Sequence, residues 1–113
     1  MTDITIKKAS GTWTVRAGGA VIGESKRALE LTEGTRAPVI YFPRADIATA
    51  FLEPSAHSTD SPAKGTASYY SIVTKSRTIE DAAWSYEAPN AEVDQIKDHL
   101  AFHTGDLVTV ERV

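Results

Sequence analysis

Apolar and polar residues alternate along most of this chain, which is the period of β-strands that bury one face. In residues 11–25, Trp13 and Val15 share one face, residues 17–19 include two glycines, and Val21 leads a second alternating stretch. Glycine reaches positive φ without a steric cost, as tight hairpin turns require. Residues 11–25 are therefore predicted to form a β-hairpin.

The same alternation predicts five further strands. Residues 37–42 are strongly apolar and β-branched, and Pro43 ends this strand because proline cannot donate a hydrogen bond to a neighbouring strand. The polar residues 55–65 are expected to form a loop. The other four predicted strands cover residues 26–34, 66–73, 81–89 and 107–113.

Two segments carry apolar residues at helical spacing. Residues 43–54 begin and end with proline, and Ile47 and Phe51 would share one face of a helix there. Residues 91–100 form the second predicted helix, with Asn90 as its N-cap. The chain is therefore predicted to be mainly β, with one or two short helices and a closed or half-open sheet.

Length and composition narrow the class of protein. At 113 residues, the chain (1–113) has the length of a single domain. The net charge is −3 and no short window is rich in lysine or arginine, which disfavours nucleic acid as a partner. The absence of cysteine excludes disulfides, thiolate metal sites and cysteine nucleophiles. No run of about 18 apolar residues and no leader pattern occurs, so no membrane association is predicted and a cytoplasmic location is expected.

Six segments of the chain belong together, in the order WTVRAGGAVIGES, VIYFPRADI, FLEPS, PAKGTASYYS, AAWSYEAP and IKDHLAF. In this combination they resemble a bacterial family known as domain of unknown function 427, which is also labelled nucleotidyltransferase-like. The resemblance implies a tent-like (Mss4-like) fold, in which two sheets meet around a cleft, and it implies no particular activity. The family commonly has a cysteine just before its Pro-x-Lys-Gly segment, where this chain has Ser61, so cysteine chemistry is not expected to be the shared function.

Lys64 and Gly65 raise the question of a phosphate site. A phosphate-binding loop of the Walker type needs a glycine five positions before a Gly-Lys-Ser/Thr group and a helix after it, and this segment has neither. A looser hypothesis places Lys64 as a cation at the mouth of a cleft, beside a glycine whose backbone a ligand can approach. The alternative is a turn glycine next to a solvated lysine.

Two other segments contain polar residues at the end of a predicted strand, and residues at such positions often line a cleft. Tyr41 and Arg44 belong to the first, and Arg44 could bind a carboxylate or phosphate, pair with Asp46 or Glu87, or cap the next helix. Trp84, Tyr86 and Glu87 belong to the second, where Trp84 is either a pocket wall or a core residue.

The nucleotidyltransferase label has little support in the residues. Such enzymes generally hold a divalent metal on clustered carboxylates, often an Asp-x-Asp pair behind a Gly-Ser turn, and this chain has neither pattern. His99 and His103 stand four residues apart and would share a face if one helix carried both, as in a zinc pair, but no glutamate follows His99 as in metalloproteases. No metal or cofactor is predicted.

Three functions from different classes stay open. The first is a domain that binds a small polar or anionic ligand in a cleft between sheets. The second is a transferase- or hydrolase-like enzyme with Glu87 or His99 as general base and Lys64 stabilising negative charge. The third is an interaction module whose sheet edge, near the Trp13 hairpin, pairs with a partner or in a homodimer. The first hypothesis rests on these residues, of which only one of the two adjacent tyrosines can face the cleft: Lys64, Gly65, Arg44, Tyr41, Tyr70 (or Tyr69), Trp84 and Tyr86.

Overall fold

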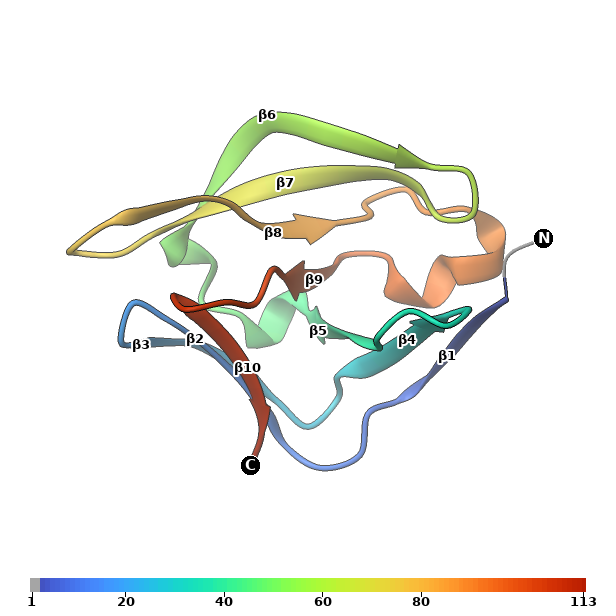
Figure 1. The fold of residues 1–113 in the computed structure, drawn as a ribbon, viewed down its shortest axis with the longest axis horizontal. Coiled ribbons are helices and arrows are strands. Elements are labelled where there is room, and N and C mark those ends of the chain that lie inside the picture. Colours follow the sequence, from blue (N-terminus) through green and yellow to red (C-terminus); the bar gives the residue numbers. More distant parts are fainter. Residues whose placement is uncertain (1–2) are drawn as a thin grey trace.

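A computed structural model describes residues 3–113 and shows two antiparallel β-sheets with short 3₁₀ helices between some of the strands (Figure 1). The prediction of a mainly β fold is confirmed. The strands are β1 (Ile4–Lys8), β2 (Trp13–Ala17), β3 (Ala20–Ser25), β4 (Leu29–Glu33), β5 (Val39–Pro43), β6 (Leu52–Ser61), β7 (Gly65–Val73), β8 (Thr78–Ser85), β9 (His99–Phe102) and β10 (Val108–Arg112). The 3₁₀ helices are η1 (Arg44–Asp46), η2 (Thr49–Phe51) and η3 (Ala91–Ile96).

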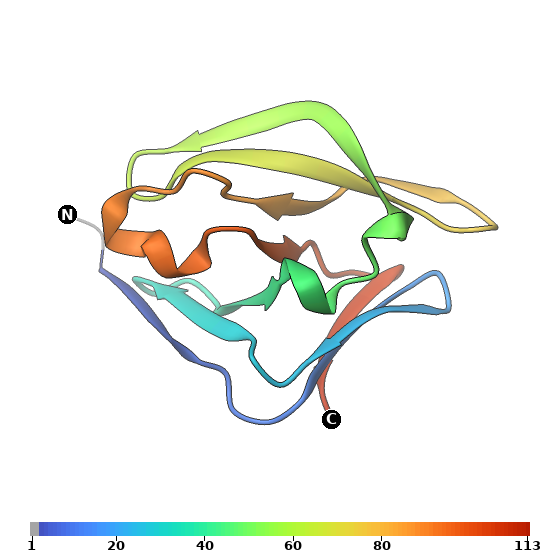
Figure 2. The same cartoon turned by 180° about the vertical axis from the view of Figure 1, so that it is seen from behind.

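The larger sheet has seven strands in the order β1-β4-β5-β9-β8-β7-β6, and the smaller one has the order β10-β2-β3. Neither sheet closes on itself, so the fold is two open sheets and not a barrel. Figures 1 and 2 show β6 and β7 on one side of the molecule, β1 and β4 on the other, and β5 and β9 between them. Glu33 on β4 nevertheless contacts Lys64 in the β6–β7 turn, so the larger sheet must curl until these distant strands meet.

Alternation along the strands gives the larger sheet two apolar faces. One face packs against the smaller sheet, where Phe42 and Leu100 meet Val15 and Ile22 in one core cluster. The opposite face lies inside the curl and forms a second cluster. Neighbours in sequence separate cleanly between the two clusters, since Phe42 belongs to the first and Tyr41 to the second. The second cluster is built around Leu31, Tyr41, Ala67, Tyr86, Val93, Ile96 and Ala101.

The β2–β3 hairpin forms as predicted. Gly18 and Gly19 are the two residues between its strands, and both have positive φ, at 55° and 86°. Two successive residues with positive φ fit the right-handed twist of the strands and strongly favour glycine. The local sequence therefore determines this turn.

The helix predicted over residues 43–54 is wrong. Two separate single-turn 3₁₀ helices, η1 and η2, take its place. Between them Ile47 is extended, with φ −108° and ψ 137°, and forms a β-bridge with Gly23. Ile47 is buried against the smaller sheet, and this tertiary contact overrides the weak local preference for a helix.

The helix predicted over residues 91–100 is also wrong in length and type. Only the 3₁₀ helix η3 forms, with a kink at Val93, and His99 already begins strand β9. Asp98 has a positive φ of 57°, which ends any helical path before β9. The Asn90 side chain does not cap η3 and instead donates a hydrogen bond to the Pro62 carbonyl over 3.0 Å.

The loop predicted over residues 55–65 is mostly strand. β6 runs to Ser61, and only residues 62–64 turn between β6 and β7. β6 is an edge strand whose side chains are largely exposed, so it lacks the apolar alternation that marked the other strands. Its Pro54 is tolerated because an edge strand needs no hydrogen-bond donor on its open side. β1, the other edge of this sheet, was not predicted.

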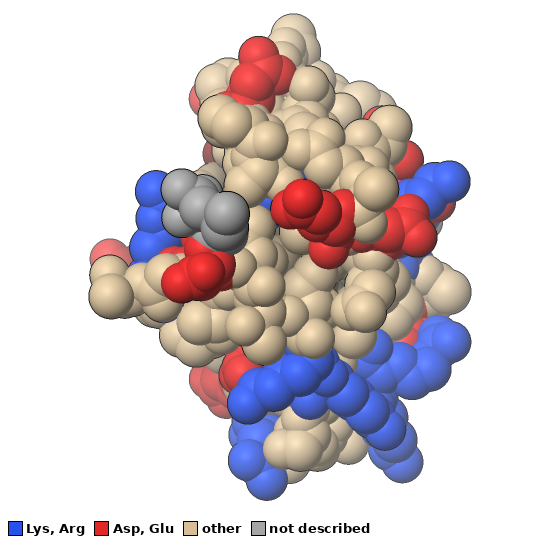
Figure 3. Space-filling view, turned by 90° about the vertical axis from the view of Figure 1, so that its right-hand side faces the viewer, with Lys and Arg blue, Asp and Glu red and all other residues tan. Residues whose placement is uncertain are grey.

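Basic side chains gather toward one end of the face shown in Figure 3, although no short stretch of sequence is rich in them. Lys8 at the end of β1 and Lys26 just after β3 line one shallow hollow together with Gly11. The fold thus brings cations together from separate segments, which a window along the sequence cannot detect. Within residues 3–113, no helix is both long and apolar enough to cross a membrane.

Candidate functional site

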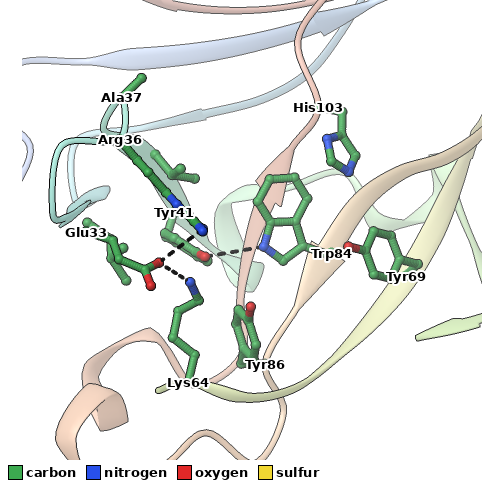
Figure 4. A pocket seen from close by; sticks show the side chains of 11 residues that line it. Glu33, Arg36, Ala37, Tyr41, Lys64, Tyr69, Trp84, Tyr86 and His103 are labelled. Carbon is green, nitrogen blue, oxygen red and sulfur yellow. Dashed lines mark hydrogen bonds and ion pairs between the residues drawn. The ribbon is translucent and has the colours of Figure 1, made fainter. Parts of the chain in front are cut away.

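The concave face of the larger sheet contains a cavity of about 200 Å³. Its walls come from β4, β5, β7 and β8, from the β4–β5 loop and from the β6–β7 turn (Figure 4). Four residues of the predicted ligand set line it, namely Lys64, Tyr41, Trp84 and Tyr86. Tyr69, the alternative to Tyr70 in that set, lines it as well, together with three polar residues that were not predicted: Glu33, Arg36 and His103.

Lys64 is a buried cation and not a solvated one, with only 9% of its surface exposed. The tight turn after β6 holds its backbone, because the Lys64 N–H donates to the Ser61 carbonyl over 3.2 Å. Its Nζ lies 2.5 Å from Glu33 Oε1, and Arg36 Nη1 lies 3.8 Å from the same oxygen. Two cations therefore converge on one carboxylate at this wall, as Figure 4 shows.

Tyr41 and Trp84 form the floor of the cavity. The Trp84 indole N–H donates a hydrogen bond to Tyr41 Oη over 3.2 Å, and the two rings meet edge to face at 6.4 Å. Burial raises the pKa of Tyr41 far above that of an exposed phenol. Burial likewise raises the pKa of Tyr86 to about 12, with the nearby Tyr69 and Glu33 acting in the same direction. Both phenols are therefore neutral near pH 7 and can donate hydrogen bonds.

Tyr69 is the member of the tyrosine pair that faces the cavity. Its ring stacks nearly parallel to His103 at 6.0 Å, and the His57 ring lies 4.5 Å away. His103 also packs against Trp84 at 4.5 Å. The alternation of β7 indicated that one tyrosine would face the cleft, but it did not indicate which.

Tyr70 lies outside this cavity and belongs to a second polar cluster. Its hydroxyl donates to Glu87 Oε2 over 2.8 Å and accepts from Arg44 Nη2 over 3.2 Å. The Arg44 guanidinium lies 5.4 Å from the Tyr70 ring centre and 3.5 Å from the Glu87 carboxylate. Burial is the main cause that raises the pKa of Tyr70 above its ordinary value.

The structure thus separates the predicted ligand residues into two places. Arg44 pairs with Glu87, one of the alternatives that its sequence allowed, and not with Asp46. Asp46 instead accepts hydrogen bonds from Ser25 and Arg27, and these bonds lower the pKa of its carboxyl group. Neither Arg44 nor Glu87 lines the cavity around Lys64.

Gly65 shapes the turn and does not line the cavity. Its φ of 110° is one that residues other than glycine rarely adopt, and a Cβ there would lie 3.4 Å from the Ala88 carbonyl oxygen. The adjacent Lys64 carbonyl accepts a hydrogen bond from the Asn90 N–H over 3.0 Å. This packing fixes the turn that directs Lys64 toward Glu33.

The two histidines that suggested a metal pair are not on one helix. His99 begins β9, with its Nδ1 2.9 Å from the Lys97 carbonyl oxygen, whereas His103 follows the strand and lines the cavity. The helical premise of that hypothesis is therefore wrong. Within residues 3–113, no three side chains among histidine, aspartate and glutamate gather as metal ligands would.

Comparison with protein families agrees with the resemblance seen in the six segments. The model of the family described as domain of unknown function 427 matches residues 5–113. The short name of that model refers to nucleotide transfer, but its description assigns no activity. A search of curated proteins finds no match.

Proposed function

The chain belongs to the domain of unknown function 427 family, and we propose that it binds a small anionic ligand in the cavity between Glu33, Lys64 and Trp84. The family description names no ligand, so the proposal depends on the chemistry of the cavity itself. One observation carries it. The charged wall of this cavity holds two cations, Lys64 and Arg36, around a single carboxylate.

Arg36 is the group best suited to meet an incoming anion. Its side chain is 78% exposed and reaches Glu33 only at 3.8 Å, so little interaction energy is lost when it turns to a ligand. A guanidinium can bind a carboxylate or phosphate through two parallel hydrogen bonds. Lys64 stays paired with Glu33 in this arrangement and adds its positive charge to the same wall.

The phenols supply directional contacts. Figure 4 shows the Tyr86 hydroxyl pointing into the space between Lys64 and Trp84. Tyr86 is only 5% exposed as a residue, and it lines the cavity. Because this phenol is neutral, it can donate a hydrogen bond to an oxygen of the ligand. The rings of Tyr41, Tyr69 and Trp84 provide apolar walls for the remainder of a small molecule.

A thermal-shift screen followed by calorimetry tests this proposal. The panel should contain inorganic phosphate, sugar phosphates, nucleotides and small carboxylic acids. We expect at least one anion to bind, and we expect Arg36→Gln and Tyr86→Phe each to weaken that binding by roughly tenfold, the loss of one good hydrogen bond to a charged group. Arg77→Gln is the matched control, because Arg77 is an exposed residue of the β7–β8 turn, and it should leave the affinity unchanged.

The proposal fails if no anion of the panel binds, or if an anion binds with the same affinity to all four proteins. Lys64→Met is a further variant, but its stability must be measured first because it also removes the closer of the two cations that contact Glu33. Glu87 and His99, the two predicted general bases, do not line the cavity, so the proposal contains no catalytic step.

A further inference from the structure

A second and larger cavity adjoins the first. Its volume is about 580 Å³, in the range of cavities that hold small organic ligands. The two cavities share four lining residues, of which Trp84 and His103 have the largest side chains. His103 is exposed, so its ring can be displaced at low cost where the two cavities meet.

The chemistry of the second cavity differs from that of the first. Its walls are largely apolar and include Trp13, Ile40, Phe102 and Val110. The charged residue on its lining is Glu30, which pairs with Lys7 at 3.4 Å. An anion is therefore favoured beside Lys64 and Arg36 and disfavoured at the end near Glu30, whereas an apolar group is favoured between them.

We propose that the ligand is amphipathic and occupies both cavities. Its anionic head lies beside Arg36 and Lys64, and its aromatic or aliphatic body extends past Trp84 toward Trp13. This inference rests on the proposed function, since it assumes that the head binds in the first cavity. It adds a ligand class, namely acids with an apolar body several carbon atoms long.

The two tryptophans make a direct test possible. The chain contains two tryptophans, and both line the second cavity, but only Trp84 lines the first. Each indole N–H gives one cross-peak in a ¹H–¹⁵N spectrum, and Trp13→Phe assigns them. The probes are phenylacetate, 4-phenylbutanoate and 6-phenylhexanoate, with the corresponding neutral amides as controls.

We expect phenylacetate to shift the Trp84 peak alone and the longer acids to shift both peaks. The dissociation constant should fall by about fourfold for each added methylene that becomes buried. The amides should bind at least tenfold more weakly than the acids. Val110→Asp places a negative charge on the apolar wall. It should abolish the gain in affinity with the chain length of the acid and leave the affinity for phenylacetate unchanged.

Thr109→Asp is the matched control, because Thr109 is the adjacent residue of β10 and does not line this cavity. Long acids that bind no tighter than phenylacetate and leave Trp13 unshifted would overturn this inference while the proposed function stands. Amides that bind as tightly as the acids would overturn the inference that the head group of the ligand is anionic. If no acid shifts either indole peak, the inference is overturned, and if the anion panel also gives no binding, the proposed function fails with it.

Discussion

Lys64 and Glu33 are 31 residues apart in the chain and form an ion pair across the concave face of the larger sheet, with Nζ 2.5 Å from Oε1. Their side chains are only 11% and 15% exposed. The pair joins the end of β4 to the turn of the β6–β7 hairpin, and three strands (β5, β9 and β8) lie between β4 and that hairpin in the sheet order. It therefore contributes to the curl of the sheet as well as to the charge of the cavity.

Removing one partner of this pair should be destabilising. A buried charge that loses its only partner costs about 3–5 kcal/mol, but Arg36 still contacts Glu33 at 3.8 Å. We therefore expect Lys64→Met to lower the free energy of unfolding by about 2–3 kcal/mol. Urea denaturation measures the change. Lys75→Met, an exposed lysine in the β7–β8 turn, should stay within about 0.5 kcal/mol of the parent protein.

The same pair can be tested with a double-mutant cycle. Glu33→Gln alone should also destabilise the protein, because it leaves the Lys64 ammonium buried without a carboxylate. The double variant Lys64→Met with Glu33→Gln should cost less than the sum of the two single changes, by about 1 kcal/mol or more. Strict additivity would contradict a direct interaction between these side chains.

The hydrogen bond from Trp84 to Tyr41 supports the floor of the cavity. Tyr41→Phe removes the acceptor of the indole N–H, and we expect a loss of about 1–2 kcal/mol because both groups are largely buried. The Trp84 indole cross-peak should move, whereas the Trp13 peak, whose N–H donates to the Ser10 carbonyl, should not. Tyr86→Phe is the control: its hydroxyl points into the cavity, so the cost should be below about 0.5 kcal/mol.

Stability should fall in alkaline solution because of the buried tyrosines. Burial raises the pKa of Tyr86 to about 12, against 10.0 for a free phenol. Between these two pH values the unfolded chain has lost a proton that the folded state retains, so the unfolding free energy decreases as the pH rises. The pKa of Tyr41 is raised in the same direction and adds to the effect.

Urea denaturation at pH 8 and pH 11 measures this alkaline loss. We expect the parent protein to lose roughly 1 kcal/mol per buried tyrosine over that range, since one pKa unit corresponds to about 1.4 kcal/mol. Tyr86→Phe should remove roughly 1 kcal/mol of the loss, the share of this one phenol. A loss of equal size in the variant would show that Tyr86 ionises as readily in the folded state as in the unfolded chain.

Much of the fold was predictable because most strands bury one face. Alternation indicated the β2–β3 hairpin and β4, β5, β7, β8 and β10. It did not indicate β6, since an edge strand with exposed side chains has no such pattern. The helix predicted over residues 91–100 is only the 3₁₀ helix η3, but Val93 and Ile96 are buried as that prediction required. The reason is that residues three apart share one face of a 3₁₀ helix as well.

The cavity was only partly predictable. Trp84 and Tyr86 stand two residues apart on one strand and its extension, so their common face followed from the strand period. Glu33 could not be assigned to the same place, because it reaches Lys64 only through the curl of the whole sheet. Arg44 follows the strand that carries Tyr41, but it pairs with Glu87 outside the cavity. No local sequence pattern indicates that Tyr41 lines the cavity and that Arg44 does not.

Gly23 allows the smaller sheet to approach the segment after β5. This buried residue forms a β-bridge with Ile47, and a Cβ at position 23 would lie 2.5 Å from Ile47 Cδ1 and 2.8 Å from the Asp46 carbonyl oxygen. We expect Gly23→Ala to lower the free energy of unfolding by about 1–3 kcal/mol, the range for inserting an atom into a packed core. Thermal or urea denaturation measures it.

A second substitution separates the two contacts of that added methyl group. Ile47→Val removes the Cδ1 atom but leaves the Asp46 backbone oxygen in place, so Gly23→Ala combined with Ile47→Val should recover only part of the loss. Gly105→Ala is the control, since Gly105 does not have a positive φ and a Cβ there would have no neighbour within 4 Å. We expect it to be neutral or to stabilise the protein by up to about 1 kcal/mol. Equal losses at both glycines would mean that backbone freedom, and not the approach of Ile47 and Asp46, requires glycine at position 23.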